Sequence, residues 1–198
     1  MTNFLCNNPS LYALEKQMQQ PPGYRPRGHG FCIPCVDWRS RGNYSEIVDC
    51  VISRMQLEQL SERVLEIFSV DEKEKIFKDA NHRRIFYTLL MIKRNNFLLE
   101  LPNYAAAVFL LTADEKLWNT VRCNVLDTGI YFDRVKLGRV TLEEYILFHA
   151  AKDVYFGTKH IRLSELVDRE LIPDEVLKLI VNALVIEKCG VEIVKQEV

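Results

Sequence analysis

Three side chains near the N-terminus, His29, Cys32 and Cys35, have a spacing that suits a metal knuckle. Two thiolates separated by two residues can bind one Zn²⁺ through a tight turn, and His29 or a distant cysteine would complete the tetrahedron. A structural zinc would also order a segment rich in proline and glycine. No second cysteine pair follows at finger-like spacing, so the alternative is two reduced thiols in a loop. Zinc at His29, Cys32 and Cys35 is the one cofactor that the sequence suggests, and the fold does not require it.

The same segment places planar cations beside an aromatic ring. Its prolines favour an extended polyproline II backbone, and its glycines allow close approach to another surface. Guanidinium groups next to tyrosine suit a phosphate backbone or an acidic protein surface. The alternative is a solvated arm that lies over its own helical domain. The residues predicted to bind a partner are Tyr24, Arg25, Arg27, Arg39 and Arg41.

Catalytic motifs are missing from the sequence. There is no glycine-rich phosphate loop and no Gly-x-Ser-x-Gly elbow, and His82, His149 and His160 are isolated from one another along the chain. Glu143 and Glu144 are adjacent, so on a helix their side chains point about 100° apart and do not form an acid–base pair. We therefore expect a protein that is not an enzyme. The alternative is a metal-dependent enzyme, and stoichiometric metal in the purified protein would favour it.

A possible DNA-reading element, separate from the basic segment, lies near the C-terminus, where residues 164–175 lead into an apolar stretch at 176–186. The arrangement resembles a helix-turn-helix, but a recognition helix must present polar side chains to base edges. Residues 176–186 are too apolar for that role and are expected to form a core helix. Basic residues at 78–84, with His82 among them, would extend the basic arm only if the fold brought the two together.

Charge divides the chain into two regions. The whole sequence has 26 Lys and Arg against 27 Asp and Glu, a net charge of −1, which excludes a uniformly basic nucleic-acid binder. Residues 1–44 hold five of these cations and two of the acids, a charge of +3, and 45–198 must then total −4. Five of seven prolines also fall in the first 34 residues. We therefore expect a Pro/Gly-rich basic arm at 1–44 and a separate domain at 45–198.

Apolar residues recur at helical spacing through most of this second region. One stretch begins at Ser45, a good N-cap residue, and another opens near Asp71. Pro102 begins a short stretch whose lack of a polar face over 104–111 predicts full burial. A strand is plausible only at 130–137, with 161–163 as its partner. The fold class expected is mainly α, a compact domain of about six or seven helices with an irregular arm and at most one small β-hairpin.

Capping signals mark where several of these helices begin and end. Residues 112–115 and 141–144 both match the capping box, in which each end satisfies the other's free amide. Gly157 is a natural left-handed cap for the helix that the second box begins. Pro173 predicts the first turn of the last helix, and Gly190 predicts its end.

The sequence also carries signals about the cellular compartment of the protein. Residues 1–9 lack a cationic start followed by an apolar run, and the apolar stretches are too short or too interrupted to span a bilayer. We expect a cytoplasmic protein with no membrane partner and with mostly reduced cysteines. Cys123 and Cys189 fall within apolar helical patterns and are expected to pack as small core residues. Exposed aromatic clusters would support a homodimer.

A resemblance to known proteins covers roughly residues 80–190 of the chain. Three stretches carry it: 105–118 (Ala-Ala-Ala-Val-Phe-Leu-Leu-Thr-Ala-Asp-Glu-Lys-Leu-Trp), 145–157 and 164–172. They resemble small uncharacterised proteins of bacterial phages and conjugative elements, and residues 21–28 (Pro-Pro-Gly-Tyr-Arg-Pro-Arg-Gly) look like a leader of mobile-element proteins. Such cargo often binds a host or competing protein and includes inhibitors of CRISPR–Cas nucleases.

Two functional hypotheses follow. The resemblance implies a non-enzymatic interaction protein that modulates a host or bacterial defence protein, most concretely an anti-CRISPR inhibitor. The alternative is a nucleic-acid binder that uses the basic arm, with or without a zinc knuckle.

Overall fold

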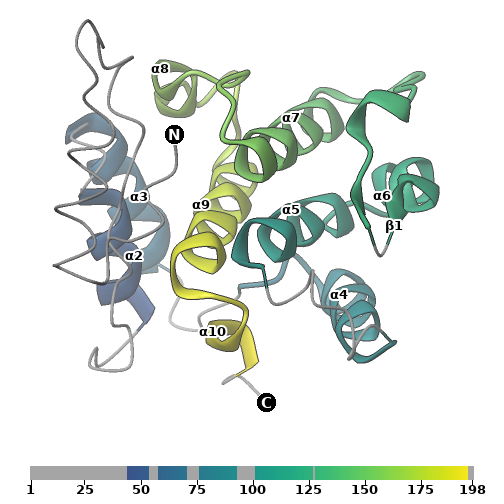
Figure 1. The fold of residues 1–198 in the computed structure, drawn as a ribbon. Coiled ribbons are helices and arrows are strands. Elements are labelled where there is room, and N and C mark those ends of the chain that lie inside the picture. The colour runs from purple at the N-terminus through teal and green to yellow at the C-terminus, as the bar shows by residue number, and fades with distance from the viewer. Residues whose placement is uncertain (1–43, 54–57, 71–75, 93–100, 127, 196–198) are drawn as a thin grey trace, which may run out of the picture. The chain divides into compact units, whose positions relative to one another are not determined.

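Helices make up most of the part of the chain that the structure, a computed structural model, describes: residues 44–53, 58–70, 76–92, 101–126 and 128–195 (Figure 1). All of them belong to one unit, Val36–Val198. The α-helices are α2 (Tyr44–Ile52), α3 (Glu58–Val70), α4 (Ala80–Ile92), α5 (Pro102–Thr112), α6 (Glu115–Val121), α7 (Leu142–Phe156), α8 (Leu163–Val167), α9 (Asp174–Cys189) and α10 (Glu192–Lys195). Two 3₁₀ turns, η4 (Arg122–Asn124) and η5 (Phe132–Arg134), flank strands β1 (Val125–Leu126) and β2 (Gly129–Ile130). The predicted mainly α class is confirmed.

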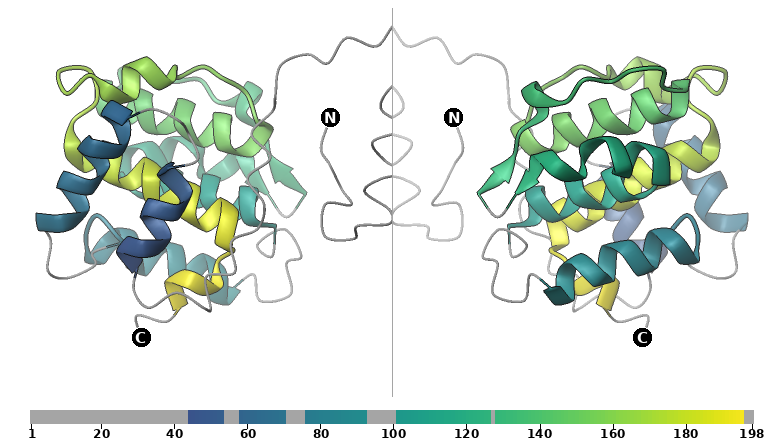
Figure 2. Two further views of the ribbon diagram at one scale, coloured as in Figure 1. Left: turned by 90° about the vertical axis from the view of Figure 1, so that its left-hand side faces the viewer. Right: turned by 90° about the vertical axis from the view of Figure 1, so that its right-hand side faces the viewer.

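Helix α5 lies at the centre of the core. Its residues from Tyr104 to Thr112 are all buried, as its lack of a polar face predicted. Pro102 occupies its first turn, where a missing amide hydrogen costs no helical hydrogen bond. Helices α7 and α9 make the most extensive contacts with α5 (Figure 1). Helices α2 and α3 pack on α9, whereas α4 and α6 pack on α5, and Figure 2 gives two further views of this arrangement.

Two buried polar side chains join segments that are distant in sequence. Asn182, fully buried on α9, accepts a hydrogen bond from the Tyr44 hydroxyl at 2.9 Å and donates one to the Ile76 carbonyl at 2.8 Å. Arg63, on α3, is only 3% exposed and donates to Asp174 and to two backbone carbonyls. These bonds position α2 and α3 against the C-terminal helices.

The capping predictions succeed at most sites. Thr141 and Glu144 form the predicted capping box at the start of α7. Gly157 ends that helix in the left-handed conformation with φ of 67°, and Gly190 follows α9 with φ of 85°. Pro173 stands one residue before α9 rather than in its first turn.

The capping box predicted at 112–115 is wrong. The Thr112 hydroxyl points back into α5 and donates to the Val108 and Phe109 carbonyls at 2.8 and 3.0 Å. Asp114 caps α6 instead, accepting the Leu117 amide at 2.9 Å. Because only Ala113 and Asp114 separate the two helices, Thr112 is still part of α5 and cannot cap α6.

The small hairpin lies a few residues earlier than the strand expected at 130–137. Val125 pairs with Ile130, and the chain then enters η5, where buried Phe132 packs on Phe148 with ring centroids 5.3 Å apart. The expected partner at 161–163 does not form a strand, because the Ile161 amide donates to Asp153 and α8 begins at Leu163. Aromatic packing therefore overrides the partial alternation of 130–137.

Candidate functional site

The residues that the sequence singled out for partner and zinc binding lie outside the described residues. They are Tyr24, Arg25, Arg27, Arg39 and Arg41 for a partner, and His29, Cys32 and Cys35 for zinc. These assignments stay predictions. The features that the structure does place belong to the helical part of the chain.

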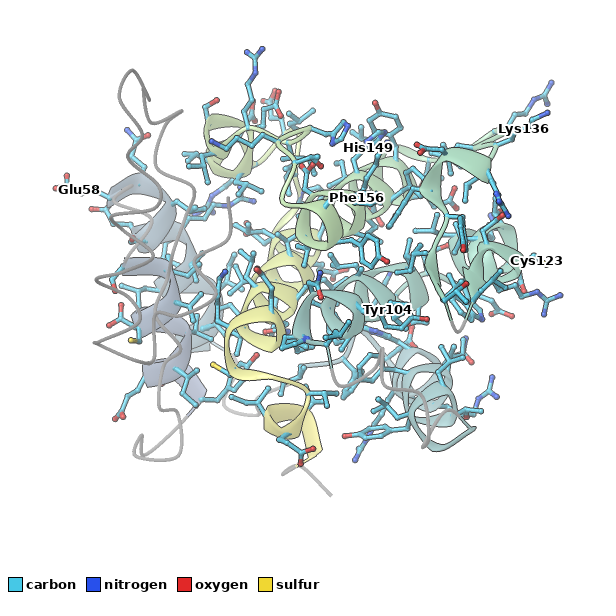
Figure 3. All side chains as sticks on the ribbon, viewed as in Figure 1. Glu58, Tyr104, Cys123, Lys136, His149 and Phe156 are labelled. Atoms are coloured by element: carbon cyan, nitrogen blue, oxygen red, sulfur yellow. The ribbon has the colours of Figure 1, made fainter. Side chains whose placement is uncertain are left out.

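One face of α7 exposes large apolar side chains. Leu142, Tyr145 and Phe156 are 52%, 50% and 51% exposed. Half-buried His149 lies between Tyr145 and Phe156 in the sequence, and Figure 3 labels His149 and Phe156 on this helix. Residues three, four or seven apart lie on one side of a helix, so these four form a continuous line, called here the α7 stripe. The opposite side of α7 packs on α5 through buried residues such as Leu147 and Ala151.

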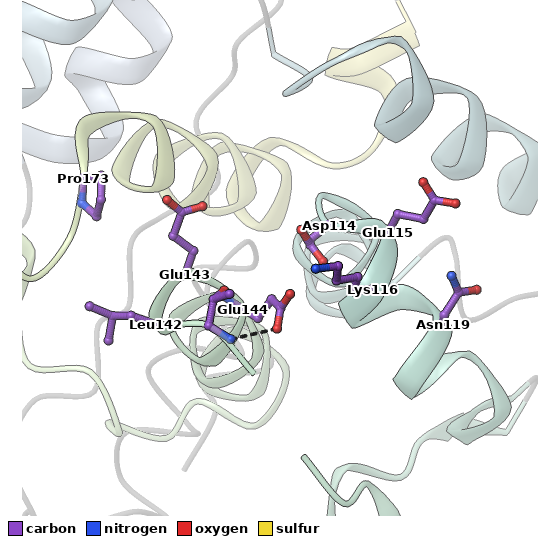
Figure 4. A pocket seen from close by; sticks show the side chains of 9 residues that line it. Asp114, Glu115, Lys116, Asn119, Leu142, Glu143, Glu144 and Pro173 are labelled. Atoms are coloured by element: carbon purple, nitrogen blue, oxygen red, sulfur yellow. Dashed lines mark hydrogen bonds between the residues drawn. The ribbon is translucent and has the colours of Figure 1, made fainter. Parts of the chain in front are cut away.

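An open groove of about 800 Å³ adjoins the start of the α7 stripe (Figure 4). It is lined by residues from the beginnings of α6 and α7 and from the turn before α9: Asp114, Glu115, Lys116, Asn119, Thr141, Leu142, Glu143, Glu144 and Pro173. Four of these side chains are carboxylates and one is an ammonium, so this acidic groove is negatively charged. Leu142 belongs to both features, which makes the groove and the stripe one continuous surface.

The four carboxylates of the acidic groove have different tasks. Asp114 accepts the Leu117 amide, and Glu144 accepts the Thr141 amide at 2.9 Å, so both serve as helix caps. Glu115 and Glu143 are exposed in the first turns of their helices, where the helix dipole favours negative charge. These two side chains are therefore the ones that present the charge of the groove to a partner.

A second cluster joins Asp153 and His160 beside the α7 stripe. The carboxylate of Asp153 accepts hydrogen bonds from the His160 and Ile161 amides, from the Thr158 hydroxyl, and from His160 Nδ1 at 2.6 Å. Burial acts to raise the pKa of Asp153, but these hydrogen bonds, led by those of the two amides, outweigh it and lower the pKa below its ordinary value. Asp153 thus fixes the 158–161 turn onto α7 and orients the His160 ring.

His149 packs against this turn. Its ring centroid lies 5.2 Å from that of His160 and 4.3 Å from that of Tyr145. Burial lowers the pKa of His149, and the charge of His160 lowers it further. Its Nδ1 atom is buried with no hydrogen-bond partner among the described residues. Neither His149 nor His160 lines the acidic groove.

His82 does not belong to the basic surface suggested for 78–84. Its side chain is 1% exposed, its Nδ1 accepts the Lys78 amide, and its Nε2 lies 2.9 Å from the Phe109 carbonyl oxygen. Burial is the main cause that lowers its pKa to about 4. The neighbouring Lys78, Arg83 and Arg84 are exposed. His82 is therefore a neutral core residue, whereas these three cations face solvent.

The expectation for 176–186 is confirmed. Within α9, Val176, Leu177, Leu179, Ile180 and Val181 are all buried, as are most of the following residues. This helix has no polar face to read bases, so it is a core helix.

Three cysteines lie in the described ranges: Cys50, Cys123 and Cys189. Cys189 is half-buried, but Cys123 is exposed, so the prediction that it packs in the core is wrong. Cys123 lies in η4, between Val121 and Val125 in the sequence. The side chains of these two valines are buried, whereas that of Cys123 is exposed. Within these same ranges, no group of three or more His, Cys, Asp or Glu side chains could hold a metal ion.

The α7 stripe is not among the sites predicted from the sequence. Tyr145 and Phe148 both fit the apolar spacing of their helix, and only Phe148 is buried. The signal was present in the spacing of Leu142, Tyr145, His149 and Phe156, but a helix that is apolar on two sides does not reveal which side faces the core.

The described helices include none that is long and apolar enough to cross a membrane. No protein-family model, curated protein or solved structure matches this chain.

Proposed function

We propose that this chain is a non-enzymatic interaction protein of mobile-element origin that binds a nucleic-acid-handling defence protein, most concretely a CRISPR–Cas nuclease, and inhibits it in the cytoplasm. The observation that carries the proposal is the continuity of the acidic groove with the exposed α7 stripe. The resemblance of 105–118, 145–157 and 164–172 to proteins of phages and conjugative elements supports the choice of partner.

Charge favours a partner of this class. Proteins that bind nucleic acids expose lysine and arginine, which neutralise phosphates. The acidic groove offers the opposite charge through exposed Glu115 and Glu143. Complementary charge speeds encounter and fixes the orientation of two proteins. A groove that occupies the cationic surface of a nuclease would compete with its nucleic acid.

The α7 stripe supplies the apolar part of such an interface. Tyrosine is enriched among the few residues that dominate binding energy, and these residues lie in patches that exclude water. Tyr145 is half exposed and stands one helical turn from Leu142, which lines the groove. An interface centred on Leu142 and Tyr145, with Glu115 and Glu143 on its rim, therefore combines an apolar anchor with charged neighbours.

The test is a panel of purified, guide-loaded CRISPR–Cas nucleases assayed for DNA cleavage and for complex formation with the full chain. We expect one member to be inhibited, and we expect Tyr145→Ala to weaken that complex by at least about tenfold, the effect of losing a typical interface anchor. Glu115→Gln with Glu143→Gln should slow association most strongly at low salt.

A matched control is Glu62→Gln with Glu170→Gln, which removes two exposed carboxylates elsewhere and should leave binding unchanged. If no member of the panel is bound or inhibited, the proposal is wrong. Equal effects of the groove and control variants would reject the groove as the interface.

A further inference from the structure

Exposed cations line the segment that follows the hairpin. Val135 has extended backbone and packs against the core, as does Leu137, whereas Lys136 between them is exposed and points away from the ribbon (Figure 3). Successive side chains along an extended backbone point to opposite sides, which is consistent with the outward direction of Lys136 after Val135. Arg134 and Arg139 are exposed as well. We call Arg134, Lys136 and Arg139 the basic loop.

A stacked pair stands at the start of the basic loop. The guanidinium carbon of Arg134 lies 4.4 Å from the centroid of the Tyr131 ring. The Tyr131 amide donates to the Asn124 carbonyl at 2.9 Å, which fixes this pair beside η4, where Arg122 is exposed. One face of the guanidinium therefore rests on an aromatic ring that is itself held by the hairpin, and the side chain is ordered before any ligand arrives.

The charge of this region is positive. Residues 122–139 contain four Lys and Arg against Asp127 and Asp133, a charge of +2. Asp133 pairs with Lys152 on α7 at 3.5 Å, so its charge is offset from outside the stretch. The region thus has the opposite sign to the acidic groove, and its ligand must differ from the partner proposed for that groove.

We infer that the basic loop, with Tyr131 and Arg122, is a binding site for single-stranded nucleic acid. Cations spaced along a surface segment can follow a phosphate backbone, and an arginine plane stacked on tyrosine is a platform for an unpaired base. Arg122 and Arg134 lie in the single 3₁₀ turns η4 and η5, and Lys136 and Arg139 lie outside the helices and strands, so no α-helix carries these cations into a duplex groove, which favours a single strand. An acidic protein would use the charges without requiring the stacked pair.

The experiment measures the fluorescence anisotropy of a labelled twelve-nucleotide DNA strand and of its RNA equivalent, titrated with the full chain at several salt concentrations. The test variant is Arg134→Gln, Lys136→Gln, Arg139→Gln. The control variant, Lys78→Gln, Arg84→Gln, Arg162→Gln, removes the same number of exposed lysine and arginine side chains from other elements. Since the arm at 1–44 also carries cations, the readout is the difference between these two variants.

We expect the basic-loop variant to weaken binding by at least about tenfold and to reduce the slope of log K against log salt by about 2, as three lost phosphate contacts predict. The control variant should keep most of the affinity. Tyr131→Phe, which keeps the ring, should bind as the wild type does, whereas Tyr131→Leu should bind more weakly.

Absence of binding to both strands at low salt would overturn the inference. Equal losses in the two triple variants would also overturn it, because they would show a response to net charge alone. Binding to polyglutamate but not to either oligonucleotide would assign the loop to an acidic protein and reject the nucleic acid. Unchanged circular dichroism of each variant would establish that the losses do not come from unfolding.

Discussion

The Nε2 atom of His82 lies 2.9 Å from the carbonyl oxygen of Phe109, while His82 Nδ1 accepts the Lys78 amide. With Nδ1 acting as an acceptor, the proton of the neutral ring must be on Nε2, where it is donated to Phe109. A second proton would have to displace the Lys78 amide inside the core. This relationship joins the start of α4 to the central helix α5, and it makes the stability of the fold depend on pH.

We predict that folding stability falls as pH drops from about 6.5 to 4. The pKa of His82 is lowered from 6.5 to about 4 in the folded protein, so between these values the unfolded chain binds a proton that the folded one does not. The contribution is complete above pH 6.5 and its loss amounts to about 3 kcal/mol at most. Urea unfolding of the wild type and of His82→Gln at pH 7 and pH 4.5 measures it. The same pH dependence in the variant would contradict this assignment.

The buried guanidinium of Arg63 leads to a second prediction. It donates to Asp174 and to the carbonyl oxygens of Leu166 and Ile172, so Arg63→Met would leave a carboxylate and two carbonyls without their donor. Asp174 is 45% exposed, so the cost comes mainly from the two buried carbonyls, and we expect a loss of about 2–4 kcal/mol in the free energy of unfolding. Arg169→Met is the control, because that side chain is 58% exposed and its ion pairs with Glu66 and, at 3.8 Å, with Asp174 should together contribute less than about 1 kcal/mol. Equal losses in denaturant unfolding would show that burial of Arg63 does not set its contribution.

A third prediction concerns Asn182. Replacing it with leucine would remove the hydrogen bond that it donates to the Ile76 carbonyl and the one that it accepts from the Tyr44 hydroxyl, and we expect a loss of about 2–4 kcal/mol for the two bonds. Tyr44→Phe removes only the hydroxyl and should cost about 1–3 kcal/mol. The double variant distinguishes the interpretations, because a shared hydrogen bond makes the two losses less than additive. Strict additivity in thermal or urea unfolding would argue against coupling through this bond.

The backbone at Gly157 gives a fourth prediction. Its φ of 67° is left-handed, and nothing lies within 4 Å of an added Cβ, so Gly157→Ala tests backbone strain without a clash. We expect a loss of about 1–2 kcal/mol. Gly138→Ala is the matched control: its added Cβ also meets nothing within 4 Å, and its φ is not in the left-handed region. That variant should change stability by less than about 0.5 kcal/mol, and a loss equal to that of Gly157→Ala would contradict the argument.

Local sequence signals predicted the parts of this fold that depend on neighbouring residues. The apolar run at 104–111 required burial, and Thr141 with Glu144 determined the start of α7 because both capping partners lie within four residues. Gly157 ended the same helix for an equally local reason. The local signal failed at Thr112, because its hydroxyl donates to the Val108 carbonyl within α5 and is not available to cap α6.

Tertiary structure alone decided what the surfaces and the buried polar groups do. Tyr145 and Phe148 share one helix and a similar hydrophobic character, but Phe148 is buried against Phe132 of η5, whereas Tyr145 is exposed. Apart from the Lys78 amide, the partners of Arg63, His82 and Asn182 lie from 27 to 138 residues away, so no local pattern predicts them. The sequence by itself determined a mainly α fold with its helix ends, because these follow from interactions within a few residues. The acidic groove, the α7 stripe and the buried polar contacts arise only when distant segments pack, because burial is a property of the assembled chain.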